Sequence, residues 1–159
     1  MNAIVRKANE SDFDGVGKVF AQELEFHIEL LPEMFKVADP LMTPEWYHEK
    51  LSNPDKALFV AELGKEIIGV LQLESRMNPD DPIFRPCKYV HVVDIGVAQR
   101  YRGRGIGRLL MDRAKEWALG QGVNEIELNV WELNKRALGF YESLGYQTKR
   151  RTLRLVLTE

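Results

Sequence analysis

The feature that most constrains the fold is QRYRGRGIG, residues 99–107, which follows the apolar run YVHVVDIGV at residues 89–97. It holds three arginines and three glycines, and the residues after it, RLLMDRAKEWAL, repeat apolar side chains at helical spacing. A strand, a glycine-rich turn and a helix in this order form an anion site, because the first N–H groups of a helix have no intrahelical partner and carry partial positive charge. We therefore expect this turn to bind a phosphate group.

The rest of the chain is typical of a mixed sheet with helices packed on it. Strands are expected at 3–8, 57–63, 66–75, 88–97, 124–131 and 147–158, and helices at 14–31, 45–51, 105–119 and 134–145. Asn9 or Ser11 is expected to cap the first helix, and Pro32 to end it. No linker or repeat interrupts the sequence, so we expect a single α/β (mixed α+β) domain over residues 1–159.

Composition excludes several classes of function. The 159 residues carry a net charge of −2, and a chain without a global excess of positive charge is not expected to hold nucleic acid. One cysteine, Cys87, allows neither an intrachain disulfide nor a cysteine metal cluster, so no metal is expected. No stretch approaches the roughly 18 apolar residues of a membrane span. We expect a cytoplasmic protein with no membrane partner.

The spacing of the glycines excludes two common phosphate-binding loops. A Walker loop needs a Lys-Ser or Lys-Thr pair after its last glycine, but Gly107 is followed by Arg108. The dinucleotide fingerprint needs a third glycine three residues after its second. Arg108 stands there if the first two glycines are Gly103 and Gly105, and Leu110 stands there if they are Gly105 and Gly107. Neither kind of nucleotide site is therefore expected.

Two segments resemble the GNAT superfamily of acetyl-CoA-dependent N-acetyltransferases. Residues 102–107, Arg-Gly-Arg-Gly-Ile-Gly, are similar to its Arg/Gln-x-x-Gly-x-Gly/Ala loop. Residues 129–146, NVWELNKRALGFYESLGY, resemble its later Asn-x-x-Ala-x-x-Phe-Tyr-x-x-x-Gly-Phe motif, with Tyr146 in place of the final Phe. The resemblance is strong from residue 90 to 146. Before residue 90 it rests only on the order of the expected helices and strands. It implies a GNAT-type central mixed, mostly antiparallel twisted sheet of six to seven strands flanked by about four helices.

The resemblance also implies that acetyl-CoA is the co-substrate and that backbone N–H groups of the loop hold its pyrophosphate. The positions implied to bind the coenzyme are Ile95, Gly96, Val97, Arg102, Gly103, Arg104, Gly105, Ile106, Gly107, Asn134, Ala137 and Tyr141. Asn134 and Tyr141 are seven residues apart, or two helical turns, so we expect them on one face with the small Ala137 between them. Which arginine side chains touch phosphate stays open among Arg100, Arg102, Arg104 and Arg108.

Acetyl transfer to an amine needs a neutral nucleophile, a site for the developing oxyanion and a proton for the departing thiolate. Tyr141 suits the last role because the pKa of a phenol, near 10, lies within about two units of that of a thiol, and the resemblance implies the same role. It further implies that backbone N–H groups of residues 95–97 bind the acetyl carbonyl where this strand splays from its neighbour.

His91 is the candidate general base, because an imidazole titrates near neutral pH. A hydrogen-bonded structural histidine is the alternative, and Glu127, Asn129 or a water relay could take the role instead. Asp94 is expected to be structural, bonded to backbone at the splay. Strict alternation predicts one face of the strand with His91, Val93, Ile95 and Val97, and the other with Val90, Val92, Asp94 and Gly96.

The first half of the chain offers groups that suit a small cationic amine as acceptor, although such charges are also ordinary for a solvated helix face. They are Glu23, Glu25, His27, Glu29, Phe35 and Trp46. A peptide or protein amine, N-terminal or lysine, is the alternative substrate, and a non-catalytic acetyl-CoA-binding sensor is the alternative function. Members of the family often dimerise, so the resemblance allows a homodimer.

Overall fold

The computed structural model describes residues 2–157 of the chain. The chain divides into two compact units, Met1–Asn129 and Val130–Glu159. Within the described residues, the first unit holds the sheet and three α-helices, and the second holds one α-helix followed by an extended segment.

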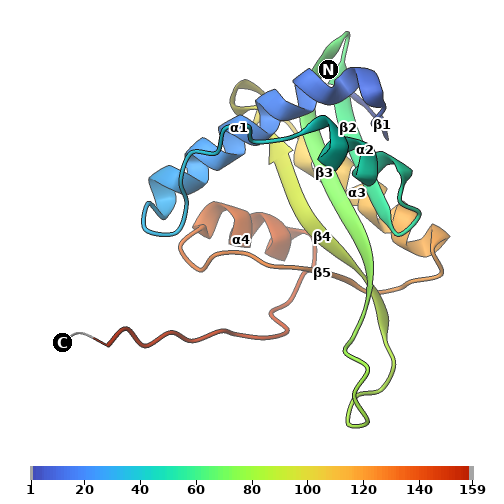
Figure 1. Ribbon diagram of the computed structural model, residues 1–159, viewed down its shortest axis with the longest axis vertical. Helices are drawn as coiled ribbons and strands as arrows, with labels where there is room; N and C mark the ends of the chain where they lie inside the picture. Colours follow the sequence, from blue (N-terminus) through green and yellow to red (C-terminus); the bar gives the residue numbers. More distant parts are fainter. Residues whose placement is uncertain (1, 158–159) are drawn as a thin grey trace. The chain divides into compact units, whose positions relative to one another are not determined.

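A five-stranded sheet forms the middle of the first unit (Figure 1). Its strands, in spatial order, are β1 (Ile4–Lys7), β2 (Lys56–Leu63), β3 (Glu66–Met77), β4 (Lys88–Val97) and β5 (Ile126–Leu128). The first four pair antiparallel, and β5 runs parallel to β4. The mixed fold with a mostly antiparallel sheet is confirmed, but the described residues form five strands and not six to seven.

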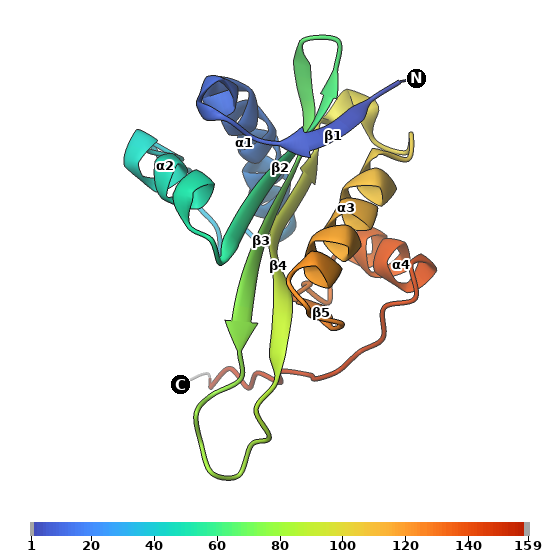
Figure 2. The ribbon, with the colours of Figure 1, turned by 90° about the vertical axis from the view of Figure 1, so that its right-hand side faces the viewer.

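Helices cover both faces of this sheet (Figure 2). On one face lie α1 (Phe13–Leu30) and α2 (Pro44–Ser52), and on the other lies α3 (Ile106–Gly120). Gly69 of β3 lets α3 approach closely, because a Cβ there would lie 3.1 Å from the side chains of both Ile106 and Leu110. The predicted bounds of these three helices are confirmed to within one residue at each end.

The core on the α1 face forms where the apolar stripe of α1 meets the sheet. Val16 and Val19 are buried against Val60 and Val70, at 0–1% exposure. Tyr47 of α2 completes this cluster. Because burial of apolar area is the main favourable contribution to folding, these contacts fix α1 on the sheet and, with it, the polar residues of its C-terminal half.

Asn9 starts α1 through a short 3-10 turn, η1 (Glu10–Asp12). Its side-chain oxygen accepts the N–H of Ser11 at 2.9 Å, and the Asp12 carboxylate accepts the N–H of Asn9 at 2.8 Å. This reciprocal capping satisfies donors that a helix start leaves unpaired. Of the two predicted caps, Asn9 caps η1, whereas α1 itself follows Asp12, which forms no side-chain cap hydrogen bond.

A β-bulge in β4 changes which of its residues share a face. Val92 pairs with Leu73 of β3, and Asp94 pairs with the neighbouring Gln72, so Val93 has no partner in β3. An extra residue of this kind reverses the side-chain alternation beyond it.

The two predicted faces of β4 are therefore wrong. Residues paired across strands share a face, so Gly96, opposite Val70, lies on the α1 side, where a Cβ would come within 2.6 Å of Glu23 Cγ. The α1 face of β4 carries His91, Asp94 and Gly96, and the α3 face carries Val90, Val92, Ile95 and Val97. His91 and Asp94, which strict alternation separates, share a face.

In the second unit, α4 (Lys135–Ser143) begins at Asn134, whose side-chain oxygen accepts the N–H of Ala137 at 3.1 Å. Beyond α4, residues 147–157 are extended but belong to no strand (Figure 1). The predicted strand at 147–158 is therefore wrong over its described residues, and residue 158 lies outside them. A strand needs a neighbour for its backbone hydrogen bonds, and the described part of this unit offers none.

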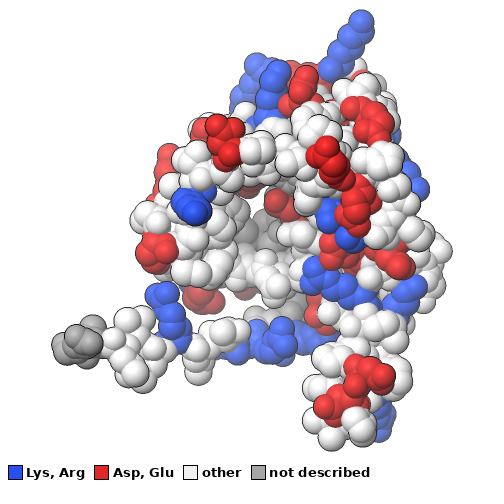
Figure 3. All heavy atoms as spheres, in the orientation of Figure 1, with Lys and Arg blue, Asp and Glu red and all other residues white. Residues whose placement is uncertain are grey.

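Three observations concern possible partners and metal ions. None of the described helices is long and apolar enough to cross a membrane. On the face drawn in Figure 3, side chains of Lys and Arg are interspersed with those of Asp and Glu. Among the described residues, no three His, Cys, Asp or Glu side chains gather as a metal site would require.

Candidate active site

Among the described residues, no backbone acceptor is seen for the first N–H groups of α3, at the turn that follows β4. Gly103 and Gly105 take left-handed backbone angles, with φ of 73° and 82°, which glycine adopts readily. The first hydrogen bond of α3 runs from the N–H of Leu109 to the carbonyl of Gly105 at 3.1 Å. The amides of residues 106–108, which precede it, have no acceptor inside the helix. We call residues 102–107 the glycine loop.

The space outside the glycine loop is open. A Cβ placed on Gly103 or Gly105 would meet no atom within 4 Å. Arg104 and Arg108 are exposed in the same turn, and neither forms an ion pair with another described residue. Open space, unpartnered amides, the positive end of the α3 dipole and two available guanidinium groups together suit a multiply charged anion.

Arg102 is held inside the first unit. Its Nε donates to the carbonyl of Val97 at 2.9 Å, and its Nη2 donates to Glu23 of α1 at 2.8 Å. Its guanidinium also lies over the ring of Phe26, 5.7 Å from the centre. The Arg102 side chain therefore joins the glycine loop to α1, while its backbone remains part of the loop.

Arg100 is likewise engaged. It forms an ion pair with Glu66 of β3, which also accepts the hydroxyl of Tyr101 at 2.8 Å. The Arg100 guanidinium is the first cause of the lowered pKa of Glu66. Of the four arginines in and around the turn, Arg104 and Arg108 are thus the two whose charge is not already paired.

Polar groups of α1 and β4 meet at the α1 face of the sheet. Glu23 packs over Gly96, as the 2.6 Å approach to a Cβ there shows, and its backbone carbonyl lies 2.8 Å from Nδ1 of His27. Asp94, two residues before Gly96, lies on the same face of β4. The result is a small acidic cluster beside the end of β4.

Asp94 has the most informative electrostatics of this cluster. Its burial, followed by the negative charge of Glu23, raises the pKa of the carboxyl to about 6, with His27 and the Ile95 backbone acting in the opposite direction. A carboxyl with such a pKa is a stronger base than usual, yet it is mostly ionised at neutral pH. This residue, expected to be structural, has the property that a general base needs.

His91 lies between two carboxylate residues in a row across the sheet, opposite Glu74 of β3 and Glu127 of β5. Its side chain is buried, at 8% exposure. Burial, followed by the positive charge of Arg76, lowers the pKa of the imidazole, and the two carboxylates partly oppose this shift. The ring is therefore neutral at pH 7 and able to accept a proton.

The splay predicted at the end of β4 is present. Pairing between β4 and β5 covers Val90 to Val92, and no residue of β5 pairs with Ile95, Gly96 or Val97. On the other side, all three pair with β3. The edge of β4 beside the glycine loop is thus free of a β5 neighbour, which is where a ligand can approach the backbone.

The second unit holds the remaining predicted residues. Asn134 uses its side-chain oxygen as the cap of α4, so it stands just ahead of the helix. The ring of Tyr141 lies 5.3 Å from that of Phe140 and 5.8 Å from that of Tyr146. Asn134, Ala137 and Tyr141 belong to one helical segment, and their approach to the glycine loop remains a prediction.

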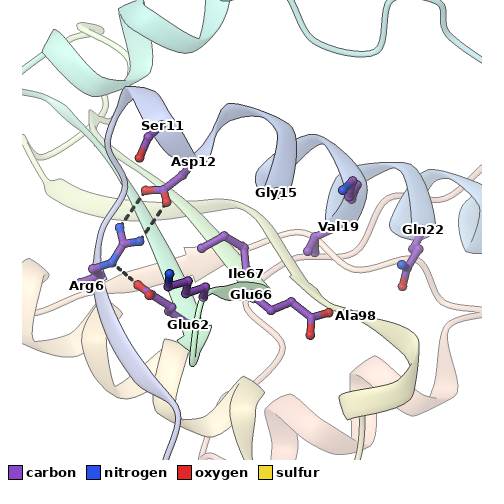
Figure 4. A pocket seen from close by; sticks show the side chains of 12 residues that line it. Arg6, Ser11, Asp12, Gly15, Val19, Gln22, Glu62, Glu66, Ile67 and Ala98 are labelled. Carbon is purple, nitrogen blue, oxygen red and sulfur yellow. Dashed lines mark hydrogen bonds and ion pairs between the residues drawn. The ribbon is translucent and has the colours of Figure 1, made fainter.

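A cavity of about 590 Å³ lies along the N-terminal half of α1 (Figure 4). Figure 4 shows Arg6 crossing it to Asp12 and Glu62, and these ion pairs measure 2.7 and 2.6 Å. Arg6, Asp12 and Glu62 all line this cavity, so the charge of the Arg6 guanidinium is already balanced by two carboxylates of the cavity wall. Its lining has both signs of charge, including Lys18 and Lys65.

Sequence reasoning missed the pairing of Glu23 and the basicity of Asp94. A signal for Glu23 existed, since it follows Val16, Val19 and Phe20 at helical spacing and so continues the buried stripe of α1. A carboxylate on an apolar stripe needs a partner. The shared face of His91 and Asp94 had no such signal, because it depends on the bulge.

Comparisons with known proteins show the family and the fold. The model of the acetyltransferase (GNAT) family matches residues 24–146. A crystal structure of a point mutant of the BH1408 protein from Bacillus halodurans superposes with a TM-score of 0.92 at 27% identity, covering 98% of this chain and 99% of that one. This share can be reached only if residues after α4 are matched as well.

Aminoglycoside acetyltransferases share the fold at lower identity. One is AAC(6')-Iy in complex with the bisubstrate analogue CoA-S-monomethyl-acetylneamine, with a TM-score of 0.75 at 18% identity and 99% of each chain covered. Another is AAC(6')-Ih from Acinetobacter baumannii, with a TM-score of 0.71 at 15% identity and the same coverage.

Proposed function

We propose that this chain, which belongs to the acetyltransferase (GNAT) family, transfers the acetyl group of acetyl-CoA to a primary amine by direct attack in a ternary complex. The observation that carries the proposal is the group of unpartnered amides at the start of α3, next to the free edge of β4. An anion site beside an open strand edge suits a ligand with a pyrophosphate and an amide-containing arm.

The residues at the glycine loop fit this co-substrate. Its N–H groups and the α3 dipole would hold the pyrophosphate, and the open space at Gly103 and Gly105 would admit it. Arg104 and Arg108, whose charges are unpaired among the described residues, would add attraction to phosphate. The bound co-substrate supplies an activated thioester, and the residues of the chain hold it in place and balance the negative charge of its phosphates.

Two groups would act on the acetyl transfer itself. Backbone N–H groups of Ile95 to Val97 would bind the acetyl oxygen as negative charge develops on it. The Tyr141 hydroxyl would donate a proton to the departing sulfur. Both assignments rest on the family resemblance, and the free edge of β4 supports the first.

The amine would be held and deprotonated at the acidic cluster. A primary ammonium has a pKa near 10.4 and is protonated at neutral pH, so a group must take its proton before attack. Asp94, with a pKa of about 6, and neutral His91 both lie on the α1 face of β4. We assign the proton to Asp94, because its carboxylate is negatively charged at neutral pH and attracts a cation, whereas His91 is neutral; His91 is the alternative.

The substrate class that fits best is a small cationic amine, such as a polyamine or an amino sugar. The negative charge of Asp94 supports it, as does the acetylneamine analogue held by the structural neighbour AAC(6')-Iy. A peptide amine is the alternative acceptor, and a coenzyme sensor without transfer is the alternative function.

The test measures coenzyme binding by calorimetry and then thiol release from acetyl-CoA with a panel of acceptors. The panel contains polyamines, neamine-type aminoglycosides, lysine peptides and peptides with free N-termini. Release with polyamines or aminoglycosides is expected. Thiol release with peptides alone would mean that the acceptor is a peptide amine. Binding of acetyl-CoA without thiol release would favour the sensor. No binding of acetyl-CoA would overturn the proposal.

A further inference from the structure

Gln72 of β3 is a buried polar residue whose side chain has no hydrogen-bond partner. The residue is 5% exposed, yet among the residues that the structure describes its amide takes part in no hydrogen bond. Leaving a buried amide unpaired costs free energy, so nearly all such groups in folded proteins are paired. An exception of this kind needs an explanation.

The Gln72 amide is not sealed inside the core. Among the described residues, Ser75 Oγ is the one side-chain oxygen or nitrogen atom that is fully enclosed and has no partner. The amide nitrogen and oxygen of Gln72 also lack a partner, so neither of them is fully enclosed. The small exposed part of Gln72 therefore includes its amide, and a molecule that approaches from solution can contact it.

The neighbours of Gln72 show on which side its amide can be used. Leu58 lies opposite it on β2, and Val70 and Glu74 flank it along the same face of β3. Leu58 and Val70 belong to the apolar cluster under α1, and the Glu74 carboxylate is already in two ion pairs. On the other side, Asp94 of β4 pairs with Gln72, so the amide and that carboxyl share the α1 face of the sheet.

Gln72 and Asp94 are two oxygen-bearing side chains on neighbouring strands. Side chains directly opposite each other have Cβ atoms about 4.5–5.5 Å apart, which is close enough for one ligand atom to contact both. The nitrogen of a primary amine suits this position, because it has N–H groups to donate and both side chains have an oxygen that accepts. Asp94 stands two residues before Gly96, next to the free edge of β4.

We propose that Gln72 is a specificity-determining residue for the acceptor, and that its side-chain oxygen accepts one N–H of a primary amine while Asp94 holds the other. The inference rests on the proposed function, since it concerns the amine of the acetyl transfer. A neutral primary amine has two N–H groups, a lone pair and one carbon substituent in a tetrahedral arrangement. With both N–H groups held at the sheet, the lone pair is left to attack the acetyl carbon. Asp94 can still hold an N–H after it has taken the ammonium proton, because a protonated carboxyl keeps an accepting oxygen.

This arrangement distinguishes primary from secondary amines. A neutral secondary amine that attacks in the same orientation has one N–H, so either Gln72 or Asp94 faces a carbon atom in place of the second. A site built to hydrogen-bond a group rejects an analogue that lacks it, because the polar atom of the site is left unpaired. The unaltered chain should therefore acetylate a primary amine with a kcat/KM at least about tenfold higher than that of its N-methyl derivative.

The experiment compares Gln72→Met with the unaltered full-length chain. Methionine is of similar length and flexibility but has no amide, so the substitution removes the hydrogen bond and keeps the space filled. Thiol release measures kcat/KM for the best acceptor of the panel above and for its derivative with one methyl group on each primary amine, which for putrescine is N,N′-dimethylputrescine. The ratio of the two values should fall about tenfold in Gln72→Met, while the affinity for acetyl-CoA measured by calorimetry stays within about twofold.

Leu58→Met is the matched control. Leu58 lies opposite Gln72 on β2 and is 2% exposed, so this substitution disturbs packing at the same place and removes no hydrogen-bonding group. Any effect of packing should change kcat/KM for both acceptors together, and their ratio should stay within about twofold. An equal fall of the ratio in Leu58→Met and Gln72→Met would mean that packing sets the selectivity, and the inference would be wrong.

The measurements separate this inference from the proposed function. Thiol release with an unchanged ratio in Gln72→Met, or equal acetylation of both acceptors by the unaltered chain, would overturn the role of Gln72 and leave the acetyl transfer standing. No thiol release with any amine would overturn the proposed function and this inference with it. Because the comparison of the two acceptors also uses the unaltered chain, the inference is tested even if Gln72→Met fails to fold.

Discussion

Glu23 of α1 and Arg102 of the glycine loop form an ion pair of 2.8 Å, and both side chains are mostly buried, at 15% and 18% exposure. Arg102 also donates to the carbonyl of Val97. One side chain thus connects α1, the end of β4 and the start of the loop that precedes α3. The proposed acceptor site and the proposed coenzyme site share this connection.

Replacing Glu23 by Ala should lower the free energy of unfolding by about 2 kcal/mol, because it leaves the mostly buried Arg102 guanidinium without its carboxylate. Urea unfolding measures this loss. Glu25→Ala on the same helix is the control, since Glu25 is exposed, and a change within about 0.5 kcal/mol is expected. Equal effects of the two variants would show that the ion pair contributes nothing of its own.

The parts of the fold that sequence predicted are those set by local pattern. The bounds of α1 and α3 and the glycine turn follow from periodicity, capping and backbone preferences, all of which act within a few residues. The reversal of faces in β4 could not be predicted, because Val93 is one apolar residue in a run that is apolar on both faces. No residue there marks the bulge.

The predicted strand at residues 147–158 was wrong for a different reason. Its two-residue period was recognised, but a strand also requires a neighbouring strand, and the described residues 147–157 pair with none. A two-residue hydrophobic period shows that a segment can form a strand, whereas the pairing of that strand depends on other elements or other chains. In the candidate site, the loop residues came from a motif, while Asp94 emerged only once its burial and the nearness of Glu23 were known.

Asp94→Asn should make the protein more stable at pH 7. The pKa of Asp94 is raised from 3.8 to about 6 by folding, so the favourable contribution of the carboxyl is full below pH 3.8 and is lost as the pH rises through 6. Removing the charge should therefore gain up to about 3 kcal/mol at pH 7 and little at pH 4. Urea unfolding at both pH values measures the difference, and an equal gain at the two would contradict the raised pKa.

The same variant should lose activity. In the unaltered enzyme, kcat/KM should rise as the pH increases through about 6, where Asp94 becomes ionised and able to take a proton. Asp94→Asn should reduce kcat/KM at least about a hundredfold at pH 7. His91→Asn is the parallel variant. If it abolishes activity while Asp94→Asn does not, the proton passes to His91 and our assignment is wrong.

Gly105→Glu should abolish acetyl-CoA binding. The substitution places a carboxylate in the open space where we propose the pyrophosphate lies, and it forces a side chain into the left-handed region at φ of 82°. Calorimetry should show affinity weakened more than about a hundredfold. Gly120→Glu, at the far end of α3 and likewise in open space, adds the same charge and should stay within about twofold. Tight binding by Gly105→Glu would exclude the loop as the pyrophosphate site.

Tyr141→Phe removes one hydroxyl and should lower kcat about a hundredfold while leaving the affinity for acetyl-CoA within about twofold, because a proton donor acts in the transition state and not in binding. Thiol release and calorimetry measure the two quantities. Tyr146→Phe is the matched control, since its ring lies 5.8 Å from that of Tyr141 and it loses the same group. Equal losses of kcat in both variants would indicate a packing effect on α4, whereas a loss confined to Tyr141 assigns the proton to its hydroxyl, because Phe preserves the ring and its contacts.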